Sequence, residues 1–363
     1  MTKIICTVTN DLNYDQRMIR ICNSLSDAGY DVTLVGIRKK NSQPLISRPF
    51  RQRRIPVVFE KGKLFYATYN LQLFFYLLFV RASIFCAIDL DTIVPVYYAS
   101  VFRRKKRVYD AHELFTEMQE VMSRPAIYKM WSWVERKYVP RFKTGYTVGA
   151  YIADIFKQRY RVSYGLVRNI TVLRPVTIPV KQQRYILYQG AVNVGRCFEY
   201  LIPAMKRVDA QLVICGEGNF YTQAKQIAAE NGLGDKVIFK GYVPPDDLRN
   251  YTLNAYVGIT LFEATATSNK YSLANRFFDY MHNGVPQLCV KYPEYEKINA
   301  DFEVAHLIKE PTEEKIAEGL NYLLENETYY NRLQQNCLKA REKYCWQHEE
   351  RVLLNIYEQL VRS

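Results

Sequence analysis

Residues that could hold an anionic ligand lie in two glycine-containing segments of the second half of the chain. The segment Tyr188–Arg196 joins a strand-like run to a helix-like run, and Gly190 and Gly195 would let its backbone approach a ligand, while Arg196 offers a bidentate cation. The segment Gly216–Gly218 follows another strand-like run but lacks the third glycine of a dinucleotide fingerprint, which disfavours NAD. Taken alone, the first segment could equally be an ordinary turn that ends in a surface arginine.

A third segment, Ser272–Pro286, contains a helix that we expect to begin near Asn275. Asn275 and Asp279 are four positions apart and therefore share one face of that helix. A carboxylate in this place could accept both hydroxyls of a ribose, while the positive end of the helix and Lys270 or Arg276 could hold phosphate. Without a ligand, the same pattern describes a helix with a solvated aspartate.

In the first half, the segment Tyr109–Glu113 places His112 at the end of a short strand, beside two carboxylates. The chain has only four histidines, so this position is a candidate for chemistry, although a structural histidine would fit as well. His112 with Glu113 and Glu117 could suggest a metal site. The spacing H-E-x-x-x-E differs from the H-E-x-x-H of zinc enzymes, so we predict no metal.

The chain is basic, and its excess charge lies in the first half. Its 363 residues have a net charge of +14; residues 1–180 hold 29 Lys and Arg against 13 Asp and Glu, whereas residues 181–363 hold 21 against 23. A one-sided basic surface attracts nucleic acid, an anionic membrane or a phosphate-bearing substrate. No recognition helix, RNP-like pattern or zinc site supports the first of these, so we expect no nucleic-acid partner.

The composition predicts a packed core in a cytoplasmic protein. Apolar residues make up 48% of the chain and charged residues 24%, which is typical of globular domains. The eight cysteines form no C-x-x-C pair, which favours reduced thiols. The apolar run Leu73–Val80 and its continuation Ala82–Ile88 are shorter than a membrane span and are interrupted by Arg81. We interpret them as a buried or surface-lying helix followed by a strand.

Strand-like and helix-like runs alternate along both halves, which predicts parallel sheets covered by helices. Asp15–Leu25 and Glu349–Leu360 have the spacing of amphipathic helices. The strands predicted in the first half are Ile4–Val8, Asp31–Gly36, Ile55–Phe59, Ile84–Ile88, Arg107–Tyr109, Tyr146–Val148 and Ile170–Leu173. After a proline-containing linker, Arg174–Lys181, the pattern restarts with strands predicted at Tyr185–Gln189, Leu212–Cys215, Val237–Lys240, Tyr256–Thr260 and Gln287–Val290.

Together these segments resemble glycosyltransferase family 4, a group of retaining enzymes with the GT-B fold. Leu273–Pro286 is similar to the family signature L-P-N-K-x-F-E-Y-M-x-x-G-x-P, and Tyr188–Arg196 is similar to Y-Q-G-x-x-x-x-G-R-G. Val108–Glu113 is similar to V-x-D-x-H-E, and Gly241–Val243 is similar to the G-x-V piece that lines the nucleobase. Thr9–Arg17 resembles the opening of a bacterial subgroup that acts on surface polysaccharides.

The resemblance implies an α/β GT-B fold, with two Rossmann-like, doubly wound domains that face a central cleft. It implies an N-terminal acceptor domain over residues 1–174 and a C-terminal donor domain over residues 175–346. A last helix, over residues 347–363, would cross back to the first domain.

The resemblance also implies a metal-independent hexosyltransferase that uses no cofactor. It would move a sugar from a nucleotide-diphosphate donor, UDP favoured over GDP, to a lipid-linked or polysaccharide acceptor with retention of configuration. His112 would contact the transferred sugar and Arg196 the donor diphosphate. The other implied donor contacts are Gly190, Gly216, Gly218, Val243, Lys270, Asn275, Arg276 and Asp279, and the implied acceptor contacts are Asn13, Asp15 and Arg17. Peripheral contact of the basic first half with the anionic inner face of a membrane would suit such an acceptor.

The chain departs from the family pattern at three positions. Tyr271 stands where the first Glu of an E-x7-E pair is usual, Cys197 where glycine is common, and Ala191 where many members have a phosphate-binding Arg. Two alternatives therefore stay open. A nucleotide-sugar 2-epimerase shares the same architecture, and a non-catalytic GT-B scaffold or partner protein is suggested by Tyr271.

Overall fold

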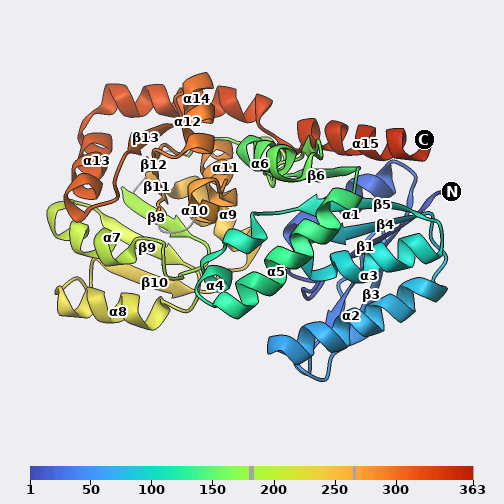
Figure 1. The fold of residues 1–363 in the computed structure, drawn as a ribbon. Helices are drawn as coiled ribbons and strands as arrows, with labels where there is room; N and C mark the ends of the chain where they lie inside the picture. The colour runs from blue at the N-terminus through green and yellow to red at the C-terminus, as the bar shows by residue number, and fades with distance from the viewer. Residues whose placement is uncertain (180–183, 265–266, 363) are drawn as a thin grey trace. The chain divides into compact units, whose positions relative to one another are not determined.

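The computed structural model describes residues 1–179, 184–264 and 267–362 and contains two parallel sheets (Figure 1). Each sheet belongs to a separate unit. Unit 1 comprises Met1–Arg168 and Glu349–Ser363, and unit 2 comprises Asn169–His348. The last two residues of the predicted linker Arg174–Lys181, at positions 180 and 181, lie outside the described residues.

Unit 1 has the strand order β3-β2-β1-β4-β5-β6-β7. The strands are β1 (Lys3–Thr7), β2 (Asp31–Arg38), β3 (Arg51–Pro56), β4 (Ile84–Ile88), β5 (Lys106–Ala111), β6 (Gly145–Thr147) and β7 (Gly165–Leu166). The helices are α1 (Gln16–Asp27), α2 (Gly62–Phe79), α3 (Asp89–Phe102), α4 (Gln119–Met122), α5 (Pro125–Tyr138) and α6 (Ala150–Tyr160), with short 3-10 turns at Phe115–Glu117 and Val139–Arg141. Because the chain moves outward from β1 to β2 and back past β1 to β4, right-handed crossovers place α1 and α2 on opposite faces.

Unit 2 repeats this topology with the strand order β10-β9-β8-β11-β12-β13. The strands are β8 (Tyr185–Gln189), β9 (Gln211–Cys215), β10 (Val237–Gly241), β11 (Val257–Thr260), β12 (Gln287–Val290) and β13 (Ala305–Ile308). The helices are α7 (Phe198–Ala204), α8 (Tyr221–Glu230), α9 (Pro245–Asn254), α10 (Thr267–Lys270), α11 (Asn275–His282), α12 (Pro293–Asp301), α13 (Glu313–Glu325) and α14 (Glu327–Lys343), with a 3-10 turn at Met205–Arg207. The restart of the pattern that the sequence predicts is therefore a second sheet of the same design.

Two predicted strands are wrong in place. Ile170–Leu173 is not a strand, because its backbone bonds to the last helix instead: Trp346 donates its backbone N–H to the Thr171 carbonyl at 3.0 Å. The strand predicted at Ile55–Phe59 runs earlier, as β3, where its register sets Arg53 opposite Val35 of β2. The sequence prediction also missed β7 and β13.

The last helix, α15 (Trp346–Arg362), places Glu349 and the residues after it in unit 1. There the buried Tyr357 ring contacts the rings of Tyr30 and Tyr146, and Lys106 Nζ donates to the Leu360 carbonyl at 2.6 Å. Glu349 is bonded twice by Arg168, through the backbone N–H and the guanidinium. These contacts anchor the C-terminal segment to the edge of the sheet at β6 and β7.

Among the described residues, no helix combines the length and the apolar composition that a membrane span requires.

A close approach in unit 2 sets the position of α11, the helix that carries Asp279. Gly258 lies in the middle of β11, and a Cβ atom there would strike the ring of Tyr280 on α11. Tyr280 in turn donates its hydroxyl to the Leu187 carbonyl of β8 at 2.8 Å. The missing side chain at Gly258 therefore lets α11 lie directly on the sheet.

We expect Gly258→Ala to lower the free energy of unfolding by about 1–3 kcal/mol, because an added methyl group overpacks this contact. Gly234→Ala is the matched control, since nothing lies within 4 Å of the added atom, and its effect should stay within about 0.5 kcal/mol. Urea unfolding of both variants measures the difference. Equal midpoints would contradict the proposed packing of α11.

Candidate functional site

At the carboxyl ends of β4 and β5, charged side chains of unit 1 form a continuous chain of contacts. Arg17 of α1 donates to Asp110 Oδ1 at 2.8 Å, and both side chains are buried. Asp110 Oδ2 lies 3.0 Å from His112 Nε2, and the other ring nitrogen of His112, Nδ1, lies 3.3 Å from Asp89 Oδ2. His112 is thus held between two carboxylates, one of which is neutralised by a buried arginine.

Asp89 reaches His112 because its backbone makes a tight turn between β4 and α3. Its φ is +52°, a left-handed conformation that aspartate tolerates better than most residues. Asp89 Oδ1 also accepts from the backbone N–H of His112 at 2.8 Å, so it fixes both the ring and the main chain. Two residues later, Asp91 accepts from the hydroxyl of Thr9 at 2.8 Å.

The burial and the charges of this cluster shift its protonation. Burial alone would lower the pKa of His112, but Asp110 and Asp89 raise it to about 9. Burial raises the pKa of Asp89 to about 6, and burial with the charge of Asp89 raises the pKa of Asp91 to about 7. Burial would also raise the pKa of Asp110, yet Arg17 and His112 together lower it. At neutral pH the ring of His112 is therefore a protonated imidazolium.

The three residues expected at the acceptor make contacts within unit 1. Asn13 is buried, donates to the Pro44 carbonyl at 2.8 Å and accepts from the Ile46 backbone N–H at 3.1 Å. Asp15 caps the first turn of α1 by accepting from Met18 at 3.0 Å. Arg17 is bound to Asp110. These contacts hold all three side chains within unit 1, and their contact with an acceptor stays a prediction.

In unit 2, the loops after β8 and β9 lie against each other. A Cβ atom at Gly216 would collide with the backbone of Gly190, and one at Gly218 would collide with Val192 and the side chain of Asn193. Val192 donates to the Glu217 carbonyl at 2.9 Å, which locks the two loops together. Gly216 and Gly218, which the sequence suggests as ligand contacts, are thus required by the close packing of these two loops.

Two arginines of unit 2 share one aromatic ring. The guanidinium carbons of Arg196 and Arg276 lie 4.4 Å and 4.6 Å from the ring centre of Phe262, directly after β11. Arg196 also donates to Asn269 at 3.3 Å, and Arg276 donates to the hydroxyl of Tyr188 at 3.2 Å. Both arginines are candidates for phosphate binding from the sequence, and the structure brings their guanidinium groups to the same ring.

Arg276 is a buried cation with no carboxylate beside it. Its side chain is 8% exposed, it forms no ion pair with any described residue, and its Nε has no hydrogen-bond partner among them. The face of Tyr188 and the carbonyls of Gln189 and Leu261 surround it. Aromatic rings and carbonyls offset part of the cost of burying this charge, but a full negative charge is missing.

Asp279 lies one turn inside α11 and is engaged by two neutral donors. Thr171 donates its hydroxyl to Oδ1 at 2.6 Å, and Gln189 donates to Oδ2 at 3.0 Å. Thr252 in turn donates to Gln189 at 2.6 Å. The helix itself begins after Ala274, which offers no side-chain cap, so its first N–H groups point outward, where Asn275 is exposed. Lys270 is exposed at the end of α10.

Val243 lines a cavity of about 400 Å³ at the carboxyl end of β10. Tyr242, Pro244 and Tyr251 form its apolar wall, and Lys240 and Asp247 add charge. Glu217 accepts from the backbone N–H of Tyr242 at 3.4 Å, which connects this cavity to the loop after β9. Val243 therefore borders a cavity, and its contact with a nucleobase stays a prediction.

Sequence reasoning missed Asp89, Asp91 and Phe262 as members of these two clusters. The first two stand directly after the strand Ile84–Ile88, and this position at a strand end was a usable signal. For Phe262 the sequence offers no such signal, because nothing in its neighbourhood indicates that two cations share its ring. Among the described residues, no group of three or more His, Cys, Asp or Glu side chains is placed to hold a metal ion.

The comparisons with known proteins agree with this architecture. Residues 170–340 match the model of the family described as glycosyl transferases group 1. The uncharacterized glycosyltransferase MJ1607 of Methanocaldococcus jannaschii is 25% identical over 193 residues, which cover 48% of this chain and 45% of that protein. The chain thus matches about half the length of this curated relative.

Two solved structures resemble the whole chain in fold. The sucrose-phosphate synthase of Thermosynechococcus elongatus covers 100% of both chains with a TM-score of 0.81 at 15% identity. Anabaena Alr3699/HepE, solved in complex with UDP and glucose, covers 100% of both chains with a TM-score of 0.78 at 13% identity. The fold is therefore GT-B, with two Rossmann-like α/β units, and its second unit carries the match to the glycosyl transferase model.

The cluster around His112 predicts an unusual titration. By NMR, the His112 ring should titrate near pH 9, well above the ordinary value of about 6.5. Because the pKa of His112 is higher in the folded protein than in the unfolded chain, its protonation stabilises the folded state. This contribution to the free energy of unfolding is complete below pH ~6.5 and is lost as the pH rises through about 9. Asp89→Asn, which tolerates the same backbone conformation, should lower this pKa by about 1 or more.

His282 and His306 provide internal controls for this titration, because burial lowers the pKa of both rings. Their titrations should be the same in the wild type and in Asp89→Asn. A wild-type His112 ring that titrates near its ordinary value would contradict the two-carboxylate arrangement.

Proposed function

We propose that this protein is a glycosyltransferase that moves a hexose from a nucleotide-diphosphate sugar, UDP favoured over GDP, to a lipid-linked or polysaccharide acceptor. Arg276 is the residue on which the proposal chiefly depends. A buried cation without a counter-ion is costly, and a bound diphosphate would supply the missing negative charge. The match of residues 170–340 to the glycosyl transferase model supports the same reading.

Arg196, Arg276 and the uncapped start of α11 would stabilise the leaving group. When the bond between the sugar and the diphosphate breaks, negative charge grows on the departing oxygen, and fixed cations nearby lower the barrier. Two guanidinium groups on the ring of Phe262 and the helix N-terminus concentrate positive charge without rearrangement. We therefore propose a metal-independent reaction, in which these groups take the part that a divalent cation plays elsewhere.

The nucleoside would lie on the loops after β9 and β10. Asp279 is half-buried one turn inside α11, and each of its carboxylate oxygens can accept more than one hydrogen bond, so it would accept from ribose hydroxyls. The cavity beside Val243 would take the base. UDP is favoured because the Anabaena protein of the same fold was solved with UDP.

His112 would act as a fixed positive charge near the transferred sugar. Its two ring nitrogens face Asp110 and Asp89, so the imidazolium has no free N–H for an acid or base step in this arrangement. Its charge can still stabilise the negative charge that develops on the leaving oxygen. Retention of configuration and an acceptor bound to unit 1 are what the resemblance to glycosyltransferase family 4 implies.

A cytoplasmic location suits the thiols of this chain. All eight cysteines are buried thiols, which fits a reducing compartment. A lipid-linked acceptor would then be met at the inner face of a membrane, where nucleotide sugars are available. We thus propose that this protein contacts glycan and lipid and does not bind nucleic acid.

We expect Arg196→Ala to slow turnover on the order of 10–100-fold, because a charge-assisted hydrogen bond to the leaving group is worth about 1.5–3 kcal/mol. Release of UDP from a panel of UDP-hexoses, with and without glycan acceptors, measures this effect. Arg207→Ala removes an exposed arginine from the same unit and should leave turnover unchanged. An Arg196→Ala protein that unfolds normally and turns over like the wild type would exclude the assigned role.

A further inference from the structure

The helix α2 is apolar on two opposite faces. The face toward the core buries Phe65, Tyr69, Leu73 and Leu77. The opposite face presents a stripe at helical spacing whose members are largely exposed: Leu64 at 57%, Leu71 at 58%, Phe75 at 52% and Phe79 at 82%. A surface helix normally has one apolar face, turned to the core, so a second apolar face is available to lipid or to a partner.

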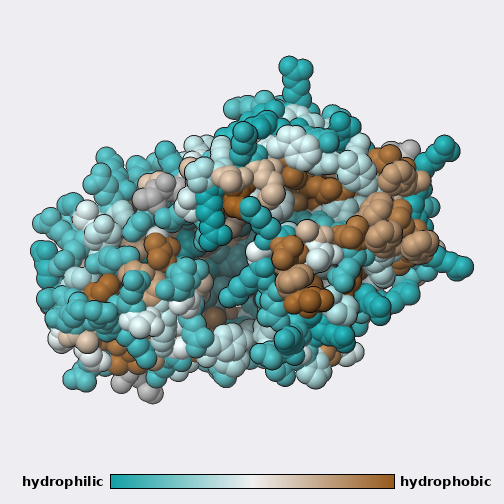
Figure 2. All heavy atoms as spheres, turned by 60° about the horizontal axis from the view of Figure 1, so that its bottom comes forward, coloured by the Kyte–Doolittle hydropathy of each residue, from teal (hydrophilic) through white to brown (hydrophobic). Residues whose placement is uncertain are grey.

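The exposed stripe continues onto the end of α3. Phe102 is 69% exposed, and its ring lies 6.2 Å from that of Phe74 and 6.4 Å from that of Tyr98. Figure 2 shows apolar side chains gathered on the part of the surface formed by α2 and α3, with hydrophilic ones around them. Such a contiguous apolar patch rimmed by polar residues marks an interaction surface.

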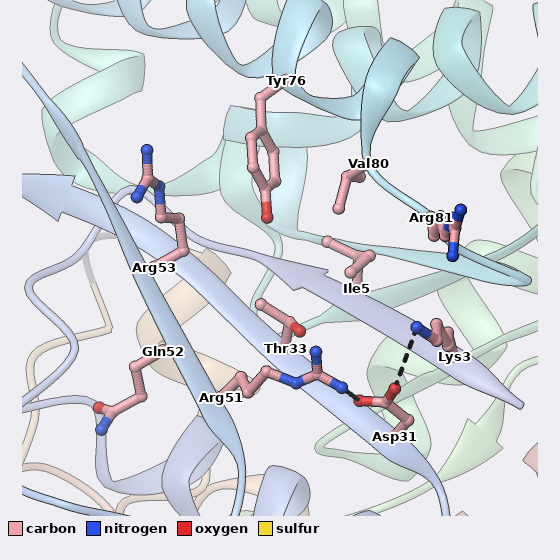
Figure 3. Close-up of a pocket in the computed structure, with 10 residues that line it drawn as sticks. All are labelled: Lys3, Ile5, Asp31, Thr33, Arg51, Gln52, Arg53, Tyr76, Val80 and Arg81. Carbon is pink, nitrogen blue, oxygen red and sulfur yellow. Dashed lines mark hydrogen bonds and ion pairs between the residues drawn. The ribbon is translucent and has the colours of Figure 1, made fainter. Parts of the chain in front are cut away.

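A basic pocket of about 390 Å³ lies at the end of this stripe, where α2 passes the first residues of β1, β2 and β3 (Figure 3). Four cations line it, against a single carboxylate: Lys3, Arg51, Arg53 and Arg81, with Asp31. Asp31 is shared by Lys3 and Arg51, whereas Arg53 and Arg81 form no ion pair with any described residue. Tyr76 and Val80 form the wall toward α2, next to the exposed Phe75 and Phe79.

We propose that this surface docks on an anionic membrane, with the apolar stripe of α2 among the lipid chains and the phosphate of a lipid headgroup in the pocket formed by Arg53, Arg81 and Tyr76. The apolar stripe and the basic pocket match the acyl chains and the phosphate headgroup of one lipid. Arginines bind phosphate well, and an apolar stripe beside basic side chains is typical of helices that lie in a membrane interface. A free phosphate would use only the pocket, and a protein partner would not require the excess of cations.

The other end of α2 lies near the charged cluster of unit 1. Tyr69 donates to the Val8 carbonyl at 2.5 Å, and the charge of Asp91 contributes to the raised pKa of Tyr66. A membrane that contacts α2 along its length would therefore present a lipid-borne acceptor to the carboxyl end of the sheet. Docking does not depend on the proposed transfer reaction, because binding to vesicles is measured without turnover.

Flotation of the full chain with lipid vesicles tests the surface. The wild type should float with phosphatidylcholine vesicles that contain phosphatidylglycerol and much less with phosphatidylcholine alone. The pair Arg53→Gln and Arg81→Gln should weaken binding about 5-fold for each arginine. The pair Phe75→Ser and Phe79→Ser should weaken it roughly 10-fold or more, since two large apolar side chains no longer insert.

The pair Lys206→Gln and Lys225→Gln removes the same charge from exposed positions of unit 2 and should bind like the wild type. Thermal unfolding of each variant shows whether it is folded, and excess inorganic phosphate should not release the wild type from the vesicles. A wild type that stays with the unbound protein, or serine variants that float as well as it does, would overturn the proposal. Release by inorganic phosphate alone would assign the pocket to a free anion instead.

Discussion

The common direction of the strands in each sheet is the constraint on which the charged clusters of both units depend. In a parallel sheet every strand ends at the same edge, so side chains far apart in the sequence meet there. In unit 1 this edge brings Asp89 and Asp110, from two neighbouring strands, to the ring of His112. In unit 2 it sets the loops after β8 and β9 against each other and brings α11 over them. Topology thus brings each cluster together, and local features such as the left-handed backbone of Asp89 and the close approach at Gly216 complete it.

The buried arginines of the two units differ in whether a carboxylate balances their charge. Arg17 has its counter-ion, Asp110, within unit 1, and Asp110 together with Asp89 raises the pKa of His112. Arg276 is surrounded by rings and carbonyls, and no described carboxylate balances it. The charge balance is thus closed in the first unit and open in the second, where an anion would complete it.

Periodicity predicted most of the fold, because fully buried strands such as Tyr185–Gln189 and Gln287–Val290 read as apolar runs with sharp ends. It failed at Ile170–Leu173, where an apolar run bonds to α15 rather than to a sheet. Residue types after strands predicted His112 and Arg196 as candidates, and helical spacing predicted Asp279, but neither predicted their partners. Packing between distant segments decides which ring contacts an arginine and which carboxylate faces a histidine. The local sequence pattern does not predict such contacts.

The most direct test of the nucleotide site is a thermal-shift measurement with UDP, GDP, ADP and dTDP on the wild type and on Asp279→Ala, each compared with its own ligand-free protein. A ligand at 100 times its dissociation constant adds about 2.7 kcal/mol to the stability of the folded state. The account predicts that one nucleotide, UDP first, stabilises the wild type and has a much smaller effect on the variant. Stabilisation of neither protein by any nucleotide would contradict the account and favour a non-catalytic GT-B scaffold.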